Sequence, residues 1–68
     1  MSSFPDRLKE LRKQKNLSQK ALGEIIGLSK RGIQNYESGI NNPTSEVLSK
    51  LADYFDVSVD YLLGRIDS

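Results

Sequence analysis

Apolar residues along the chain recur at the three- and four-residue spacing of amphipathic helices, and no segment alternates between apolar and polar as a strand does. The first apolar face consists of Phe4, Leu8 and Leu11, with Ser3 as a candidate cap and Pro5 in the first turn. The pattern then lapses over the letters KQKN. This spacing predicts a first short helix.

A second and a third helix are predicted next, because each has a serine before it and a glycine after it. Ser18 and Gly27 bound the second helix, and Ser29 and Gly39 bound the third. The side chains expected to be buried are Ala21, Leu22, Ile25 and Ile26 in the second helix and Ile33 and Tyr36 in the third, with Leu28 filling the turn between them.

Two further helices complete the pattern. Thr44 or Asn42 is the candidate cap of the fourth, and Ser58 begins a short fifth that ends near Gly64. Their apolar residues are Val47, Leu48, Leu51, Ala52, Tyr54 and Phe55, followed by Tyr61, Leu62 and Leu63. We therefore expect an all-α fold, with five short helices around one core in a single domain over residues 1–68.

Composition narrows the possible functions. The 68 residues include no cysteine and no histidine, which excludes disulfides and the usual zinc sites. No apolar run approaches the roughly 18 residues of a membrane span, and the N-terminus has no signal-peptide pattern. We therefore expect a soluble cytoplasmic protein that has no bound metal or cofactor.

No arrangement of residues indicates an enzyme. The Ser29–Lys30 and Ser49–Lys50 pairs are adjacent, so their side chains do not face each other on a helix. Asp53, Asp56 and Asp60 do not follow the spacing of a calcium-binding loop and are expected to be solvated. Nothing identifies a small-molecule ligand.

Charge is distributed unevenly along the chain. Residues 1–31 contain eight basic and three acidic residues, a net charge of +5, whereas residues 32–68 contain two basic and six acidic residues, a net charge of −4. This asymmetry suggests a cationic face of the kind that contacts nucleic acid, although basic helices are also common solvated surfaces.

The short connection around Gly27 predicts a helix-turn-helix over residues 18–38, whose second helix would enter the DNA major groove with its N-terminal end foremost. Lys30 and Arg31 stand at the positive end of that helix, where they are locally unfavourable, so their position favours contact with a polyanion. Gly32, which has no side chain, lets the backbone come close to DNA or to the preceding helix. The candidate base-reading residues are Lys30, Arg31, Gln34 and Asn35, of which 31, 34 and 35 share one face.

The segment LSQKALGEIIGLSKRGIQNYESGINNPTSEVLSKLADYFDVSVDYLLG resembles the Xre and Cro/phage-repressor helix-turn-helix family. The resemblance covers nearly the whole chain. It implies a bacterial or phage-encoded transcriptional regulator, most commonly a repressor, that binds double-stranded DNA as a homodimer. Some proteins with this fold are instead antitoxins or partners of other regulators, so a protein-interaction module is the alternative.

The resemblance also implies roles for individual residues. Ser18 and Gln19 match positions that bind a backbone phosphate, and Asn41 and Asn42 match a loop that touches the opposite backbone. Lys30, Arg31 and Asn35 match positions that usually read base edges, and Gln34 matches a more variable one that can meet phosphate instead. Arg12 and Glu37 match a partly buried structural pair.

The sequence departs from the family pattern at two places. Gly32 replaces the usual serine, threonine or alanine, and the loop SGINNP lacks the basic residue common after the glycine. At the C-terminal end, Leu62 is expected in the core. Tyr61, Leu63 and Ile66 are candidates for either core closure or a dimer surface.

Overall fold

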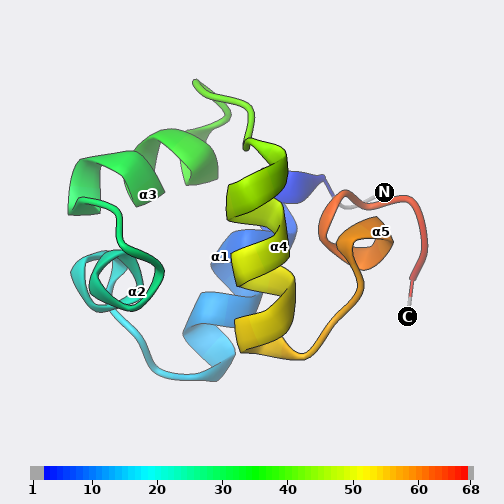
Figure 1. Cartoon of the computed structure of the whole chain (residues 1–68), viewed down its shortest axis with the longest axis horizontal. Coiled ribbons are helices and arrows are strands. Elements are labelled where there is room, and N and C mark those ends of the chain that lie inside the picture. Colours follow the sequence, from blue (N-terminus) through cyan, green and yellow to red (C-terminus); the bar gives the residue numbers. More distant parts are fainter. Residues whose placement is uncertain (1–2, 68) are drawn as a thin grey trace.

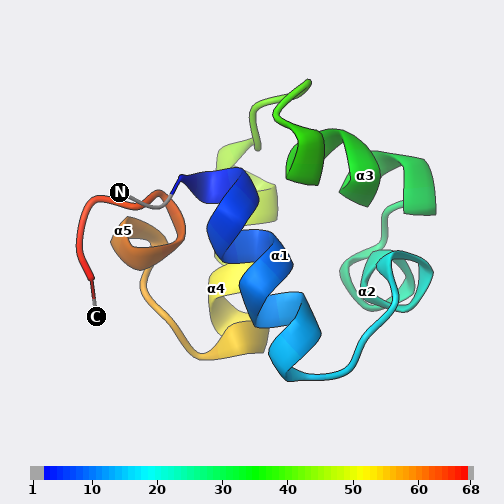
Figure 2. The same cartoon turned by 180° about the vertical axis from the view of Figure 1, so that it is seen from behind.

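The computed structural model describes residues 3–67, which form five helices and, within that range, no strand (Figures 1 and 2). The helices are α1 (Phe4–Gln14), α2 (Gln19–Ile26), α3 (Lys30–Ser38), α4 (Ser45–Phe55) and α5 (Val59–Leu62). The all-α prediction is confirmed. None of these helices is long and apolar enough to cross a membrane.

The helix boundaries follow from their capping residues. The hydroxyl oxygens of Ser18, Ser29, Thr44 and Ser58 each accept a hydrogen bond from the backbone N–H three residues later. Thr44, and not Asn42, is therefore the cap of α4. Ser3 occupies the cap position of α1, but its hydroxyl donates to Asp6 and caps no backbone N–H.

Left-handed residues end three of the helices. Gly27 ends α2 with φ +90° and Gly39 ends α3 with φ +82°, as predicted. Asp56 ends α4 in the same conformation, at φ +56°. The sequence gives no clear signal for that residue, because aspartate adopts this conformation far less readily than glycine.

All five helices contribute side chains to a single core. Its fully buried members are Leu8, Leu22, Ile33, Leu51 and Leu62, and burying each contributes about 1.5–3 kcal/mol. The core position expected for Leu62 is confirmed. Arg7 was not expected in this layer, yet only 5% of its surface is exposed. Its guanidinium lies 4.0 Å from the centre of the Tyr61 ring and donates to the Tyr61 carbonyl oxygen.

Ile25 is wrongly predicted to be buried, because 46% of its surface is exposed. Gly23, on another side of α2, is buried instead, against the backbone of Leu28 and Ser29. A Cβ at residue 23 would lie 2.5 Å from the Leu28 carbonyl oxygen and 3.1 Å from that of Ser29. Glycine at this position therefore allows α2 to approach the backbone that leads into α3.

Gly32 is not required for close approach of α3 to the preceding helix. A Cβ there would lie 3.6 Å from Leu28 Cβ and from Ser29 Oγ, which is ordinary van der Waals contact. The close approach between α2 and α3 thus depends on Gly23. Proximity of Gly32 to DNA stays a prediction.

Candidate nucleic-acid interface

Helix α3 lies along one edge of the molecule, joined to α2 by Gly27, Leu28 and Ser29 (Figure 1). Ile33 anchors it in the core, and it packs against both α1 and α2. Lys30 and Arg31 are exposed at its N-terminal end, and neither forms an ion pair with any residue between 3 and 67. Both cations are therefore free to meet an external anion.

An open hollow of about 460 Å³ lies where α3 faces α1 and the start of α2. Its lining comes from three helices and the loop after α3: Lys9, Gln19, Arg31, Gln34, Asn35, Glu37, Ser38 and Ile40. The structure thus brings together three of the four candidate base-reading residues with one candidate phosphate-binding residue. Lys30 does not line the hollow. It is exposed, and it directly precedes the lining residue Arg31 in the sequence.

The side chains around the hollow suit the edges of base pairs. The guanidinium of Arg31 can donate to the O6 and N7 atoms of guanine, and the amides of Gln34 and Asn35 can pair with adenine. Arg31 and Gln34 are exposed, and Asn35 is half-buried, so each has surface available for contact. The shared face of residues 31, 34 and 35 agrees with the helical spacing.

Lys9 and Ile40 are lining residues that the sequence did not single out. Lys9 belongs to α1, and only the packing of α1 against α3 brings it to this surface. Ile40 is 72% exposed in the loop where the resemblance led us to expect a basic residue. The apolar side chain offers no charge to a phosphate there.

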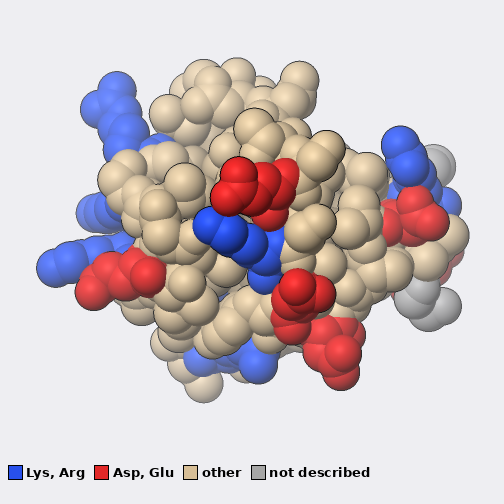
Figure 3. Space-filling view, viewed as in Figure 1, with Lys and Arg blue, Asp and Glu red and all other residues tan. Residues whose placement is uncertain are grey.

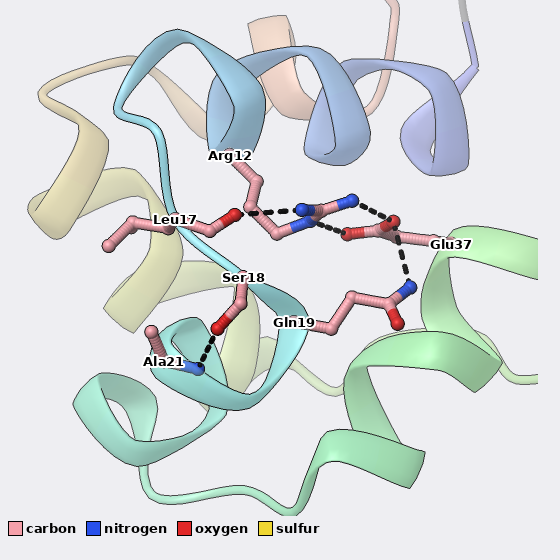
Figure 4. A network of polar contacts seen from close by, with 6 residues as sticks. All are labelled: Arg12, Leu17, Ser18, Gln19, Ala21 and Glu37. Carbon is pink, nitrogen blue, oxygen red and sulfur yellow. Dashed lines mark hydrogen bonds and ion pairs between the residues drawn. The ribbon is translucent and has the colours of Figure 1, made fainter.

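A network of hydrogen bonds under the hollow connects α1, the start of α2 and α3 (Figure 4). Arg12 donates from Nε to Glu37 Oε2 at 2.6 Å and from Nη2 to Glu37 Oε1 at 3.0 Å. Its Nη1 donates to the Leu17 carbonyl oxygen at 2.8 Å. The predicted structural role of the Arg12–Glu37 pair agrees with this geometry, in which the Arg12 and Glu37 side chains are 12% and 3% exposed.

The electrostatics of the pair favour its charged form. The hydrogen bond to Glu37 is the main cause that raises the pKa of the Arg12 guanidinium, and it outweighs the opposing effect of burial. The Arg12 guanidinium, which is charged in proteins in any case, therefore pairs with Glu37 as a cation.

Gln19 joins the same network, which the sequence did not reveal. Its Nε2 donates to Glu37 Oε1 at 3.2 Å, while the amide oxygen is turned away from the carboxylate (Figure 4). Glu37 thus fixes the side chain of Gln19, the predicted phosphate-binding residue. Finding this contact required the relative placement of α2 and α3.

The other candidate phosphate contacts lie at exposed or partly exposed positions. Ser18 is exposed, and its hydroxyl oxygen accepts the capping hydrogen bond from the Ala21 N–H at 2.9 Å. Asn41 and Asn42 are exposed in the loop between α3 and α4. Contact of these residues with phosphate stays a prediction.

Basic side chains project from the edge that carries α2 and α3, where an acidic group also lies, and acidic and basic groups are mixed over α4 (Figure 3). Not all cations of residues 1–31 are available to DNA. Arg7 stacks on Tyr61, Arg12 pairs with Glu37, and the Lys15 ammonium lies 5.2 Å from the centre of the Tyr54 ring. The net charge of that segment therefore overstates the cationic surface.

The candidate dimer surface is uneven. Ile66 is 43% exposed, whereas Tyr61 and Leu63 are half-buried and pack against the core. Because the buried Arg7 guanidinium covers one face of the Tyr61 ring, less of that ring is available to a partner. Among residues 3–67, no cluster of acidic side chains has the arrangement of a metal site.

Residues 8–62 match the model of a helix-turn-helix family. The chain is 48% identical over 60 residues to the HTH-type transcriptional regulator AnsR of Bacillus subtilis, covering 88% of this chain and 52% of that protein. It is 42% identical to the cryptic phage CTXphi transcriptional repressor RstR of Vibrio cholerae, covering 88% and 54%. The chain thus spans about half the length of these curated relatives.

The fold is similar to that of solved repressor domains. The P22 c2 repressor protein, crystallised in complex with a synthetic operator, superimposes with a TM-score of 0.86 and 32% identity, over 93% of this chain and 96% of that one.

Proposed function

This chain belongs to the Xre and Cro/phage-repressor type of helix-turn-helix family, and we propose that it regulates transcription by binding a specific sequence of double-stranded DNA. The observation that carries the proposal is the convergence of Arg31, Gln34, Asn35 and Gln19 around one open hollow. Three of these side chains belong to the helix that follows the turn. Their donors and acceptors match those of base edges in the major groove.

Base contacts and phosphate contacts have separate roles in this proposal. Arg31, Gln34, Asn35 and the nearby Lys30 read bases, although Gln34 can meet phosphate instead. Ser18, Gln19, Asn41 and Asn42 bind the backbone and fix the register. The N-terminus of α2 adds free backbone N–H groups to the phosphate site.

The protein acts by occupying its operator and excluding polymerase, without catalysis or a cofactor. The relative RstR and the solved P22 c2 protein are named repressors, which supports repression, whereas the relative BcrR of Enterococcus faecalis is named a transcriptional activator. Its place of action is the cytoplasm of a bacterium, where the DNA lies.

A homodimer on DNA is the proposed assembly, because one small domain reads only a few base pairs. Two-fold symmetry would place two recognition helices roughly 34 Å apart on one face of the duplex. Of the three candidate residues for this contact, Ile66 is the most exposed, whereas Tyr61 and Leu63 are half-buried.

Selection from a randomised duplex library at about physiological salt tests the proposal, because non-specific affinity is weak there. We expect an enriched inverted repeat. Enrichment of a single half-site would support sequence-specific DNA binding but contradict binding as a homodimer. Absence of any enriched sequence would contradict the proposed function and favour a protein-interaction module.

A further inference from the structure

We propose that Glu37 is a positioning residue that holds the Gln19 amide in the one orientation able to donate a hydrogen bond to a DNA phosphate. This inference rests on the proposed DNA-binding function. It concerns how the free protein prepares a contact, and it assigns to a buried carboxylate a task beyond pairing with Arg12.

The first argument concerns the orientation of the amide. A glutamine side chain has an NH₂ group that donates and a carbonyl oxygen that only accepts. Phosphate oxygens are acceptors, so only the NH₂ group of Gln19 can bind them. A free surface glutamine samples both orientations, and only one of the two is productive.

Glu37 removes that freedom. Its Oε1 accepts from Gln19 Nε2 at 3.2 Å, and the flipped amide would bring the Gln19 oxygen against the carboxylate, two acceptors without a proton between them (Figure 4). The NH₂ group has two protons, and one is enough for Glu37. The second N–H remains available at the hollow that Gln19 lines.

Arg12 fixes the position of the Glu37 carboxylate and balances its charge. It donates two hydrogen bonds to the carboxylate, at 2.6 and 3.0 Å, and fixes its plane. It also neutralises the negative charge that would otherwise repel a phosphate from Gln19. Glu37 is buried and cannot itself reach the duplex backbone.

The test uses duplexes of the selected operator in which single phosphates are replaced by neutral methylphosphonates. For the wild-type protein, we expect one position in each half-site where replacement weakens binding about tenfold, the effect of losing a hydrogen bond to a charged group. The Gln19→Ala variant must lose most of that penalty, which identifies the phosphate that Gln19 contacts.

Glu37→Gln is the decisive variant. Gln19 is intact in it, but an amide at residue 37 can donate as well as accept, so it no longer selects one orientation of Gln19. We therefore expect the methylphosphonate penalty at the same phosphate to fall to about the level seen with Gln19→Ala. A penalty of wild-type size would overturn the proposal. Arg12→Lys is the matched control, because lysine keeps a positive charge beside the Glu37 carboxylate, which can still orient Gln19, so its penalty should persist.

Equal loss in Arg12→Lys and Glu37→Gln would assign the effect to general loosening of α3 and would also overturn the proposal. Should neither variant fold, NMR of the wild-type protein provides the second measurement. The Gln19 side-chain protons, assigned by comparison with Gln19→Ala, should be unequally protected from exchange. Two equally exposed protons would contradict an amide held by Glu37. Failure to select any operator would instead contradict the proposed function.

Discussion

Arg12 links three segments that are separate in sequence. Its hydrogen bonds reach Glu37 near the end of α3 and the Leu17 carbonyl just before α2. A buried pair of this kind adds little net stability over an apolar pair, but removing one partner leaves a charge without compensation. The pair therefore constrains how α1, α2 and α3 meet.

Removing one member of this pair should be costly. We expect Glu37→Leu to lower the free energy of unfolding by about 3–5 kcal/mol, because the Arg12 charge is left unpaired at a largely buried site. The double variant Arg12→Met/Glu37→Leu should recover most of the loss. Urea denaturation of the three proteins measures both effects. A double variant no more stable than the single one would show that the ion pair itself supplies the stability.

Arg31 should determine sequence preference at one base pair. Arg31→Ala is expected to cost about 1–3 kcal/mol on the selected operator if the guanidinium reads a guanine. The loss should vanish on an operator that carries another base at that position. Lys20→Ala is the matched control, because this exposed cation of α2 lies outside the hollow. An equal loss on every duplex would make Arg31 a phosphate contact.

At the scale of the elements, two glycines in neighbouring helices have opposite roles. Gly32 of α3 has room for a methyl group at ordinary contact distance, whereas a Cβ at Gly23 of α2 would collide with the backbone at Leu28. Both lie in helices, so both would gain about 1 kcal/mol of helix propensity on change to alanine.

Thermal unfolding separates these two positions. Gly32→Ala should raise the midpoint by a few degrees, as expected for up to about 1 kcal/mol in a small domain. Gly23→Ala should lower it, because the carbonyl of Leu28 must move. Stabilisation by both changes would indicate that the junction of α2 and α3 yields to a methyl group at little cost.

The helices and most of their ends were predictable from local signals. Ser18, Ser29, Ser58, Gly27 and Gly39 act within one turn of themselves, so short sequence windows contain the information. Thr44 had a competitor in Asn42, and only the structure distinguishes them.

Features that depend on the angle between helices were not predictable. The exposure of Ile25 and the burial of Gly23 follow from which side of α2 meets α3. The contact of Gln19 with Glu37 joins residues 18 positions apart. Arg7 resembled a surface cation in sequence because nothing local indicates that Tyr61 returns to cover it.

At the scale of the whole molecule, the cations around the hollow act together on a polyanion. Each phosphate neutralised by the protein should steepen the dependence of affinity on salt by about 0.9 in a log–log plot. Lys9 reaches the hollow from α1, whereas Lys50 lies on α4 and pairs with Glu46 at 3.4 Å.

Titration of the operator at several salt concentrations should distinguish these two lysines. We expect Lys9→Gln to lower the salt slope by about 1, and Lys50→Gln to leave it unchanged. An unchanged slope in Lys9→Gln would place Lys9 outside the phosphate contacts. Equal changes in both variants would indicate a diffuse effect of net charge.

The most direct test of sequence reading by α3 is the ratio of two affinities. Binding is measured at about 150 mM salt to the selected operator and to a scrambled duplex of the same length and composition. Base contacts from Lys30, Arg31 and Asn35 predict a preference of about a thousandfold or more for the operator. Equal affinity for the two duplexes would mean that the protein binds only the DNA backbone, and would contradict a role as an operator-specific regulator.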